Sequence, residues 1–254
     1  MTIAVAEIII YYERLIQLKT VPETTTAREI TLKELEEKFN LKLETDPNFF
    51  REWQDNLPEI SDLQKELLDR VKAGYFNLLY YPPLLEKPIN IVIVSPLLFI
   101  GEFYLHPVRF KAEKNIEIAA EDEGLTVKGN IDTLVLQEGM WIMVIESKQA
   151  SFSIEAGLPQ ILAYMLANPD GEKLTFGMIT TGGTFIFIKL VKGDSPKYAT
   201  SAEFSLRNPG NDLYTVLRIL KRLSWGEPVK IKVPLFKGDL GGSQLLVNYA
   251  RFYN

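Results

Sequence analysis

Apolar residues in the first hundred positions recur at helical spacing, and helix-start signals precede several of these runs. Thr31-Leu32-Lys33-Glu34 is a capping box, because Glu34 can answer Thr31 three residues on. Ser61-Asp62-Leu63-Gln64 predicts a second start, leading into a long helix that Pro82-Pro83 must end. Asp46-Pro47 predicts another helix start, residues 1–12 a buried or partner-covered helix, and residues 20–26 a loop.

Apolar positions in residues 84–100 also follow helical spacing, and we expect a buried helix there that Pro96 kinks or shortens. The pattern then changes to segments rich in Val, Ile, Thr and Phe, which predict strands. These segments are residues 116–119, 126–136, 141–149, 175–180 and 184–191. Gly182-Gly183 predicts a hairpin between the last two.

Two further amphipathic segments, residues 154–165 and 212–223, predict helices after the third and fifth strands. This order predicts an α/β fold in which helices flank a mixed central sheet. We expect a helical N-terminal region over residues 1–82 and the α/β core over residues 83–254.

Composition narrows the chemistry that this chain can perform. The 254 residues include no cysteine and one histidine, His106. A disulfide framework and a cysteine zinc site are therefore excluded, and a histidine-rich metal site is disfavoured. The later apolar stretches are too short to span a bilayer, so we expect a cytoplasmic protein without a membrane segment. The net charge of −5 counts against a non-specific nucleic-acid coat, although a local basic groove or a bound cation can offset it.

The segment with most chemical content joins two predicted strands. Residues 141–145 are continuously apolar, as in a strand buried on both faces, and Glu146 and Lys148 follow. Residues two apart on a strand share a face, so the carboxylate and the ammonium point the same way, whereas Ser147 points to the other side. Asp132 on the preceding strand supplies a second carboxylate. Two carboxylates and a backbone carbonyl, that of Ser147, suit a hard cation such as Mg²⁺.

This arrangement resembles the PD-(D/E)XK nuclease superfamily, in which an Asp on one strand precedes Glu-x-Lys on the next and a helix follows. Gln160-Ile161-Leu162-Ala163-Tyr164 resembles the Gln-x-x-x-Tyr element of its RecB-like branch. Residues 45–57, 95–98 and 144–152 resemble cyanobacterial restriction-endonuclease-like proteins. The Pro that precedes the Asp in the superfamily name is absent here, where Ile131 takes its place.

The resemblance implies a restriction-endonuclease-like core and an endonuclease that hydrolyses DNA with Mg²⁺ or Mn²⁺. It implies catalytic roles for Asp132, Glu146, Lys148 and Gln160. The implied metal ligands are Asp132, Glu146 and the Ser147 backbone carbonyl, with Glu86 as a further candidate, and Tyr164 is a candidate substrate-binding residue. A homodimer is left open. The alternative is a non-catalytic module that binds nucleic acid or protein and retains the nuclease fold.

The site also sets a condition on strand register. A two-residue turn at Glu138-Gly139 would pair Gln137 with Met140 and hence Asp132 with Ile145, which puts the two carboxylates on opposite faces. We therefore predict an odd-numbered loop or a compensating β-bulge.

Overall fold

The computed structural model describes residues 23–120, 125–137, 140–149, 151–169 and 174–225. The predicted helix at residues 1–12 lies outside them. The strands are β1 (Glu23–Thr26), β2 (Lys42–Leu43), β3 (Val108–Ala120), β4 (Leu125–Gln137), β5 (Met140–Ser147), β6 (Leu174–Thr180), β7 (Thr184–Val191), β8 (Lys197–Thr200) and β9 (Phe204–Ser205). The helices are α2 (Leu32–Phe39), α3 (Asp62–Leu79), α4 (Glu86–Ile89), α5 (Ser95–Ile100), α6 (Ile154–Leu166) and α7 (Leu213–Trp225), with the π-helical segment η1 (Asn90–Val94) between α4 and α5.

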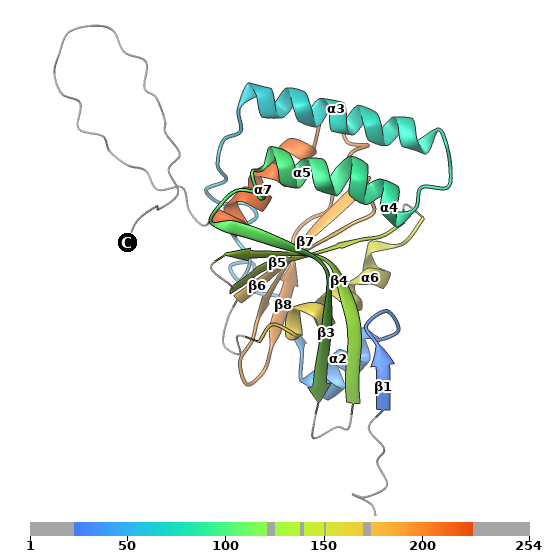
Figure 1. The fold of residues 1–254 in the computed structure, drawn as a ribbon. Coiled ribbons are helices and arrows are strands. Elements are labelled where there is room, and N and C mark those ends of the chain that lie inside the picture. Colours follow the sequence, from blue (N-terminus) through green and yellow to red (C-terminus); the bar gives the residue numbers. More distant parts are fainter. Residues whose placement is uncertain (1–22, 121–124, 138–139, 150, 170–173, 226–254) are drawn as a thin grey trace, which may run out of the picture.

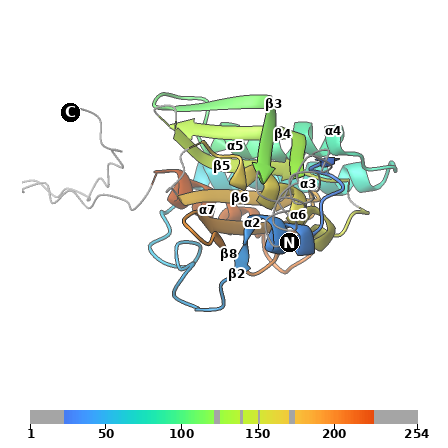
Figure 2. The same cartoon turned by 90° about the horizontal axis from the view of Figure 1, so that it is seen from below.

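The strands form one mixed sheet in the order β1-β4-β5-β6-β7-β8-β2, with β3 on the other edge of β4 and β9 paired to β7. Helices α3, α5 and α7 lie on one face of the sheet, and α6 and α2 lie on the opposite face (Figure 1). The view from below shows α2 and α6 in front of the sheet and α3 behind it (Figure 2). The mixed α/β class expected from the sequence is confirmed.

Each face of the sheet carries its own apolar core. Ile93, Leu97 and Leu217 pack with Met143 and Ile145 of β5 on the α5 and α7 side. On the other side Val144 of β5 packs with residues of α6 and α2. Because successive side chains of a buried strand point to opposite faces, β5 supplies residues to both cores, which explains its continuous apolar run.

Both capping boxes are confirmed. The Thr31 and Ser61 hydroxyls accept from the backbone N–H of the residue three positions on, and α2 and α3 start there. The predicted helix is confirmed as α4, η1 and α5, with one face buried and with Ile91 and Phe99 exposed. Its wider π turn, residues 90–94, ends two residues before Pro96, which cannot donate a helical hydrogen bond. The Gly182-Gly183 hairpin is also confirmed, with Gly182 at φ +82°.

Two expectations about the N-terminal region are wrong. No helix starts at Asp46-Pro47, because the Asp46 carboxylate instead accepts from the backbone N–H of Asn48 and closes a local turn. Part of the predicted loop at residues 20–26 is strand β1, which pairs in parallel with β4. The described part of the predicted helical region 1–82 thus contributes two strands to the sheet and core residues such as Phe50 and Leu68.

None of the helices in the described residues is both long and apolar enough to cross a membrane.

Candidate active site

A gap in strand pairing along β4 marks the candidate site. On one edge β4 pairs with β3 along most of its length. On the other edge β1 pairs with residues 125–128 and β5 with residues 133–137. Residues 129–132 therefore have no strand partner on that edge among the described strands. Those four residues are Gly129, Asn130, Ile131 and the predicted site residue Asp132.

The register of β4 against β5 contains the bulge that the site requires. Gln137 lies opposite Met140 and Leu136 opposite Trp141, as a two-residue turn dictates. The register then shifts, so that Thr133 lies opposite Ile145. Ile142 is the extra residue on β5, and the shift brings Asp132 alongside Glu146 instead of Ile145. The predicted compensating bulge is confirmed.

The β3–β4 ribbon also bends at Asp132. Its pairing is interrupted between Asp132 and the opposing Glu113, which adopts φ +53°. Figure 1 shows both strands turning sharply in the middle of their length. On the other side of the bend, β4 no longer pairs with β5 and lies beside β1. The Asp132 side chain therefore lies where β4 separates from β5.

Asp132 is held by the residue that follows Glu146. Its Oδ2 accepts hydrogen bonds from the Ser147 backbone N–H at 3.0 Å and from the Ser147 hydroxyl at 2.7 Å. Asn90 of η1 donates from Nδ2 to the same hydroxyl at 2.8 Å. Ser147 does lie on the α5 side of β5, but its hydroxyl reaches Asp132. The sequence reasoning missed this contact and the part of Asn90, because the sequence carries no signal for a pairing 57 positions apart.

Glu146, Lys148 and Gln160 form a buried polar cluster beside Asp132. Lys148 Nζ donates to Glu146 Oε1 and to Gln160 Oε1, both at 2.6 Å. Gln160 Nε2 donates to Glu146 Oε1 at 2.8 Å and to the Tyr164 hydroxyl at 2.7 Å. Glu146 is 1% exposed and Lys148 3% exposed. The structure thus brings these residues together, because Gln160 bonds to Glu146, Lys148 and Tyr164.

Glu146 has one oxygen without a partner. Oε2 is buried and accepts no hydrogen bond from the described residues. Burial, followed by the charge of Asp132, raises the pKa of Glu146 to about 8, although the nearby Lys148 ammonium lowers it. A buried carboxyl with an unpaired oxygen next to a second carboxylate is a place where a cation would relieve both repulsion and desolvation.

Tyr164 is a buried neighbour of the Glu146, Lys148 and Gln160 cluster. It is 1% exposed, and its hydroxyl also takes a hydrogen bond from the Asn130 backbone. Burial and the charge of Glu146 raise its pKa to about 12. The ring lies so close to Gly129 that a Cβ there would meet Tyr164 Cε1 at 2.6 Å. The side chain is enclosed in this way, and its substrate-binding role stays a prediction.

Glu86 lies near the cluster but apart from it. Its charge contributes to the raised pKa of Glu146. Its carboxylate is partly exposed and pairs with Arg28 at 3.8 Å. In the described part of the chain, no three acidic, histidine or cysteine residues converge closely enough to hold a metal ion by themselves. A cation here would need the two carboxylates together with backbone or water oxygens.

Basic residues of α7 contact other parts of the chain, and Arg222 donates to the Asp55 carbonyl. Arg218 donates to the Pro58 and Leu57 carbonyls and pairs with Glu59. Lys221 lies partly buried, and this burial lowers its pKa.

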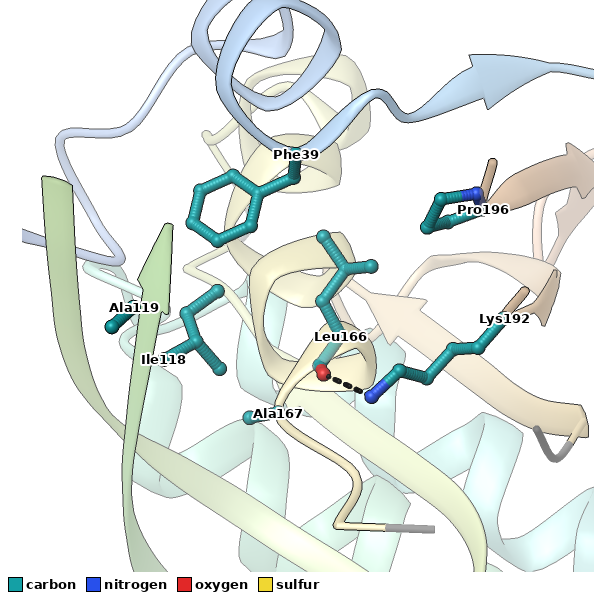
Figure 3. Close-up of a pocket in the computed structure, with 7 residues that line it drawn as sticks. All are labelled: Phe39, Ile118, Ala119, Leu166, Ala167, Lys192 and Pro196. Carbon is teal, nitrogen blue, oxygen red and sulfur yellow. Dashed lines mark hydrogen bonds between the residues drawn. The ribbon is translucent and has the colours of Figure 1, made fainter. Parts of the chain in front are cut away.

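A separate pocket of about 280 Å³ lies between α2, the end of β3, the C-terminus of α6 and the segment that follows β7 (Figure 3). It is lined by Phe39, Ile118, Ala119, Leu166, Ala167, Lys192 and Pro196. Lys192 Nζ donates to the Leu166 and Asn168 carbonyls at the end of α6. The lining contains no carboxylate, so this pocket offers no cation site.

Comparison with known proteins adds little information about the function of this site. No protein-family model matches the sequence, and no curated protein is significantly similar to it. Among solved structures, the chain is similar to one in the cryo-EM structure of a DrdV–DNA complex, with a TM-score of 0.43 and 11% identity. The match covers 62% of this chain and 13% of that one, and an overlap of this extent carries no functional argument.

Proposed function

We propose that this chain is a metal-dependent endonuclease of the PD-(D/E)XK type that hydrolyses phosphodiester bonds in DNA. The observation that carries the proposal is that Asp132, Glu146 and Lys148 come together where β4 separates from β5. One Glu146 oxygen there is buried and has no hydrogen-bond partner among the described residues. A purely structural ion pair would not need a second carboxylate beside it, because two neighbouring carboxylates repel each other.

The donor set fits a hard divalent cation. Oxygen ligands are those that Mg²⁺ and Mn²⁺ prefer, and Mg²⁺ usually keeps several waters. Asp132, Glu146 and the Ser147 backbone carbonyl would hold it, with Glu86 as a further candidate ligand. When bound, such a cation polarises a phosphodiester and lowers the pKa of a coordinated water.

Lys148 would act on the attacking water. An ammonium has three donors, and two of them are directed at Glu146 and Gln160. In the proposed reaction the third would orient a water or offset the negative charge that grows on the phosphate. Gln160 keeps its three neighbours in fixed relation, because its Oε1 accepts from Lys148 and its Nε2 donates to Glu146 and Tyr164.

A non-catalytic binding module is the competing function, and the net charge of −5 favours it. Supercoiled, linear and branched DNA incubated with Mg²⁺ or Mn²⁺ separates the two. We expect cleavage by the wild type and a loss of about 100-fold or more in Lys148→Ala.

Lys189→Ala is the matched control, since Lys189 is also a largely buried strand lysine, paired with Glu52 at 2.5 Å. It should cleave as the wild type does. Equal cleavage by Lys148→Ala, or no cleavage of any substrate with either metal, would overturn the proposal.

A further inference from the structure

A chain of hydrogen bonds runs from η1 through β5 to the Asp132 carboxylate. Asn90 Nδ2 donates to Ser147 Oγ at 2.8 Å, and Ser147 Oγ donates to Asp132 Oδ2 at 2.7 Å. The Ser147 side chain is fully buried, so water does not compete for its hydroxyl. The three residues come from three separate elements that only the fold brings together.

The direction of the chain follows from donor and acceptor chemistry. A hydroxyl carries one proton and two lone pairs, whereas the amide nitrogen of Asn90 can only donate. Because Asn90 donates to one lone pair of Ser147 Oγ, the hydroxyl proton is left for the Asp132 carboxylate. Asn90 thus fixes the direction in which Ser147 donates.

The same contacts fix the orientation of Asp132. Two donors from Ser147, the backbone N–H and the hydroxyl, converge on Oδ2. None of the hydrogen bonds among the described residues reaches Oδ1. The neighbouring backbone has no strand partner on this edge, so these two bonds are what ties the carboxylate to β5.

From this geometry we infer that Ser147 and Asn90 are positioning residues, which turn Asp132 Oδ1 toward the cation while holding Oδ2 away from it. The inference rests on the proposed cation site. Groups that bond to a metal ligand tune its orientation, and their loss commonly reduces metal affinity by about 10- to 100-fold. The π-helical segment that begins at Asn90 is of a kind often found at functional sites.

Mn²⁺ binding to the whole chain, measured by calorimetry, tests the inference without requiring activity. Ser147→Ala should weaken Mn²⁺ binding about 10- to 100-fold. Asn90→Ala should weaken it less, because the hydroxyl remains. The double variant should bind no more weakly than Ser147→Ala, since Asn90 acts through Ser147, and this non-additivity is not expected from a general loss of stability.

Ser201→Ala is the control for removing a buried serine. Ser201 Oγ accepts from the Phe187 backbone N–H and donates to the Ala202 carbonyl, away from the carboxylates. It should bind Mn²⁺ as the wild type does. Should Ser147→Ala fail to fold, Asn90→Ala carries the test, because Asn90 is only half-buried.

The outcomes separate the two levels of the account. Wild-type affinity in both Ser147→Ala and Asn90→Ala, or additive losses in the double variant, would overturn the positioning role alone. Absence of Mn²⁺ binding by the wild type would overturn the cation site itself, and the positioning role with it.

Discussion

Replacement of Glu146 by glutamine in the metal-free protein should change how stability depends on pH. The pKa of this carboxyl rises from its ordinary 4.5 to about 8 in the folded chain, first through burial and then through the charge of Asp132. The folded state therefore keeps a proton that the unfolded chain has already lost. The stability that this retained proton contributes is fully present below the pKa of the unfolded chain and is lost as the pH rises through about 8.

The size of the effect follows from the same two values. Each pH unit between them lowers the free energy of unfolding by about 1.4 kcal/mol. From about pH 6 to about pH 8 the wild type should lose roughly 2 kcal/mol, because the group is half ionised at the upper limit. For a chain of this size that corresponds to a fall in Tm of about 5 °C.

Thermal unfolding followed by circular dichroism in EDTA, at several pH values, measures this directly. The Tm of Glu146→Gln should depend much less on pH and should exceed the Tm of the wild type at alkaline pH. Glu52→Gln is the control, because Glu52 pairs with Lys189 and also has a buried unpartnered oxygen, but leaves Glu146 intact. Parallel pH profiles for the wild type and Glu146→Gln would refute the reasoning.

Four further substitutions, three around the site and one at the cap of α3, are tested by thermal unfolding. Gly129→Ala should destabilise the protein by about 1–3 kcal/mol, because its Cβ would meet the Tyr164 ring at 2.6 Å and Ala27 Cβ at 2.8 Å. Gly193→Ala, with nothing within 4 Å of its Cβ, should not, and equal effects of the two substitutions would contradict the close approach. Gln160→Leu should cost about 1–3 kcal/mol for each buried group left unpaired, and Tyr164→Phe only about 1 kcal/mol, so the reverse ranking would be evidence against the hydrogen-bond network. Ser61→Ala should lower stability by about 1 kcal/mol through loss of the α3 cap while leaving DNA cleavage unchanged, and a large loss of cleavage would link the cap to the site.

Local signals account for the parts of the fold that could be predicted from the sequence. The capping boxes at Thr31 and Ser61 involve residues three apart, so the sequence contains the whole interaction. The bulge in β5 was predictable because the turn length and the need for two neighbouring carboxylates conflict without it. Both inferences depend on periodicity and on short-range contacts.

Apart from the turn at Asp46, the missed elements depend on partners far along the chain. Strand β1 is the polar sequence Glu-Thr-Thr-Thr, which becomes a strand because β4 continues past its fork and offers a free edge. Strand β2 has two residues, too few for any pattern. The bond from Asn90 to Ser147 likewise joins elements that no spacing rule connects. At Asp46 a local side-chain turn replaces the helix that the same residues would cap.

The central claim is that Asp132 and Glu146 together bind a divalent cation, and the stoichiometry of Mn²⁺ binding tests it most directly. We expect the wild type and the Glu52→Gln control to bind Mn²⁺ at this site, and Asp132→Asn and Glu146→Gln each to lose that binding while remaining folded. Mn²⁺ binding of the same affinity and stoichiometry in all four proteins would contradict the account.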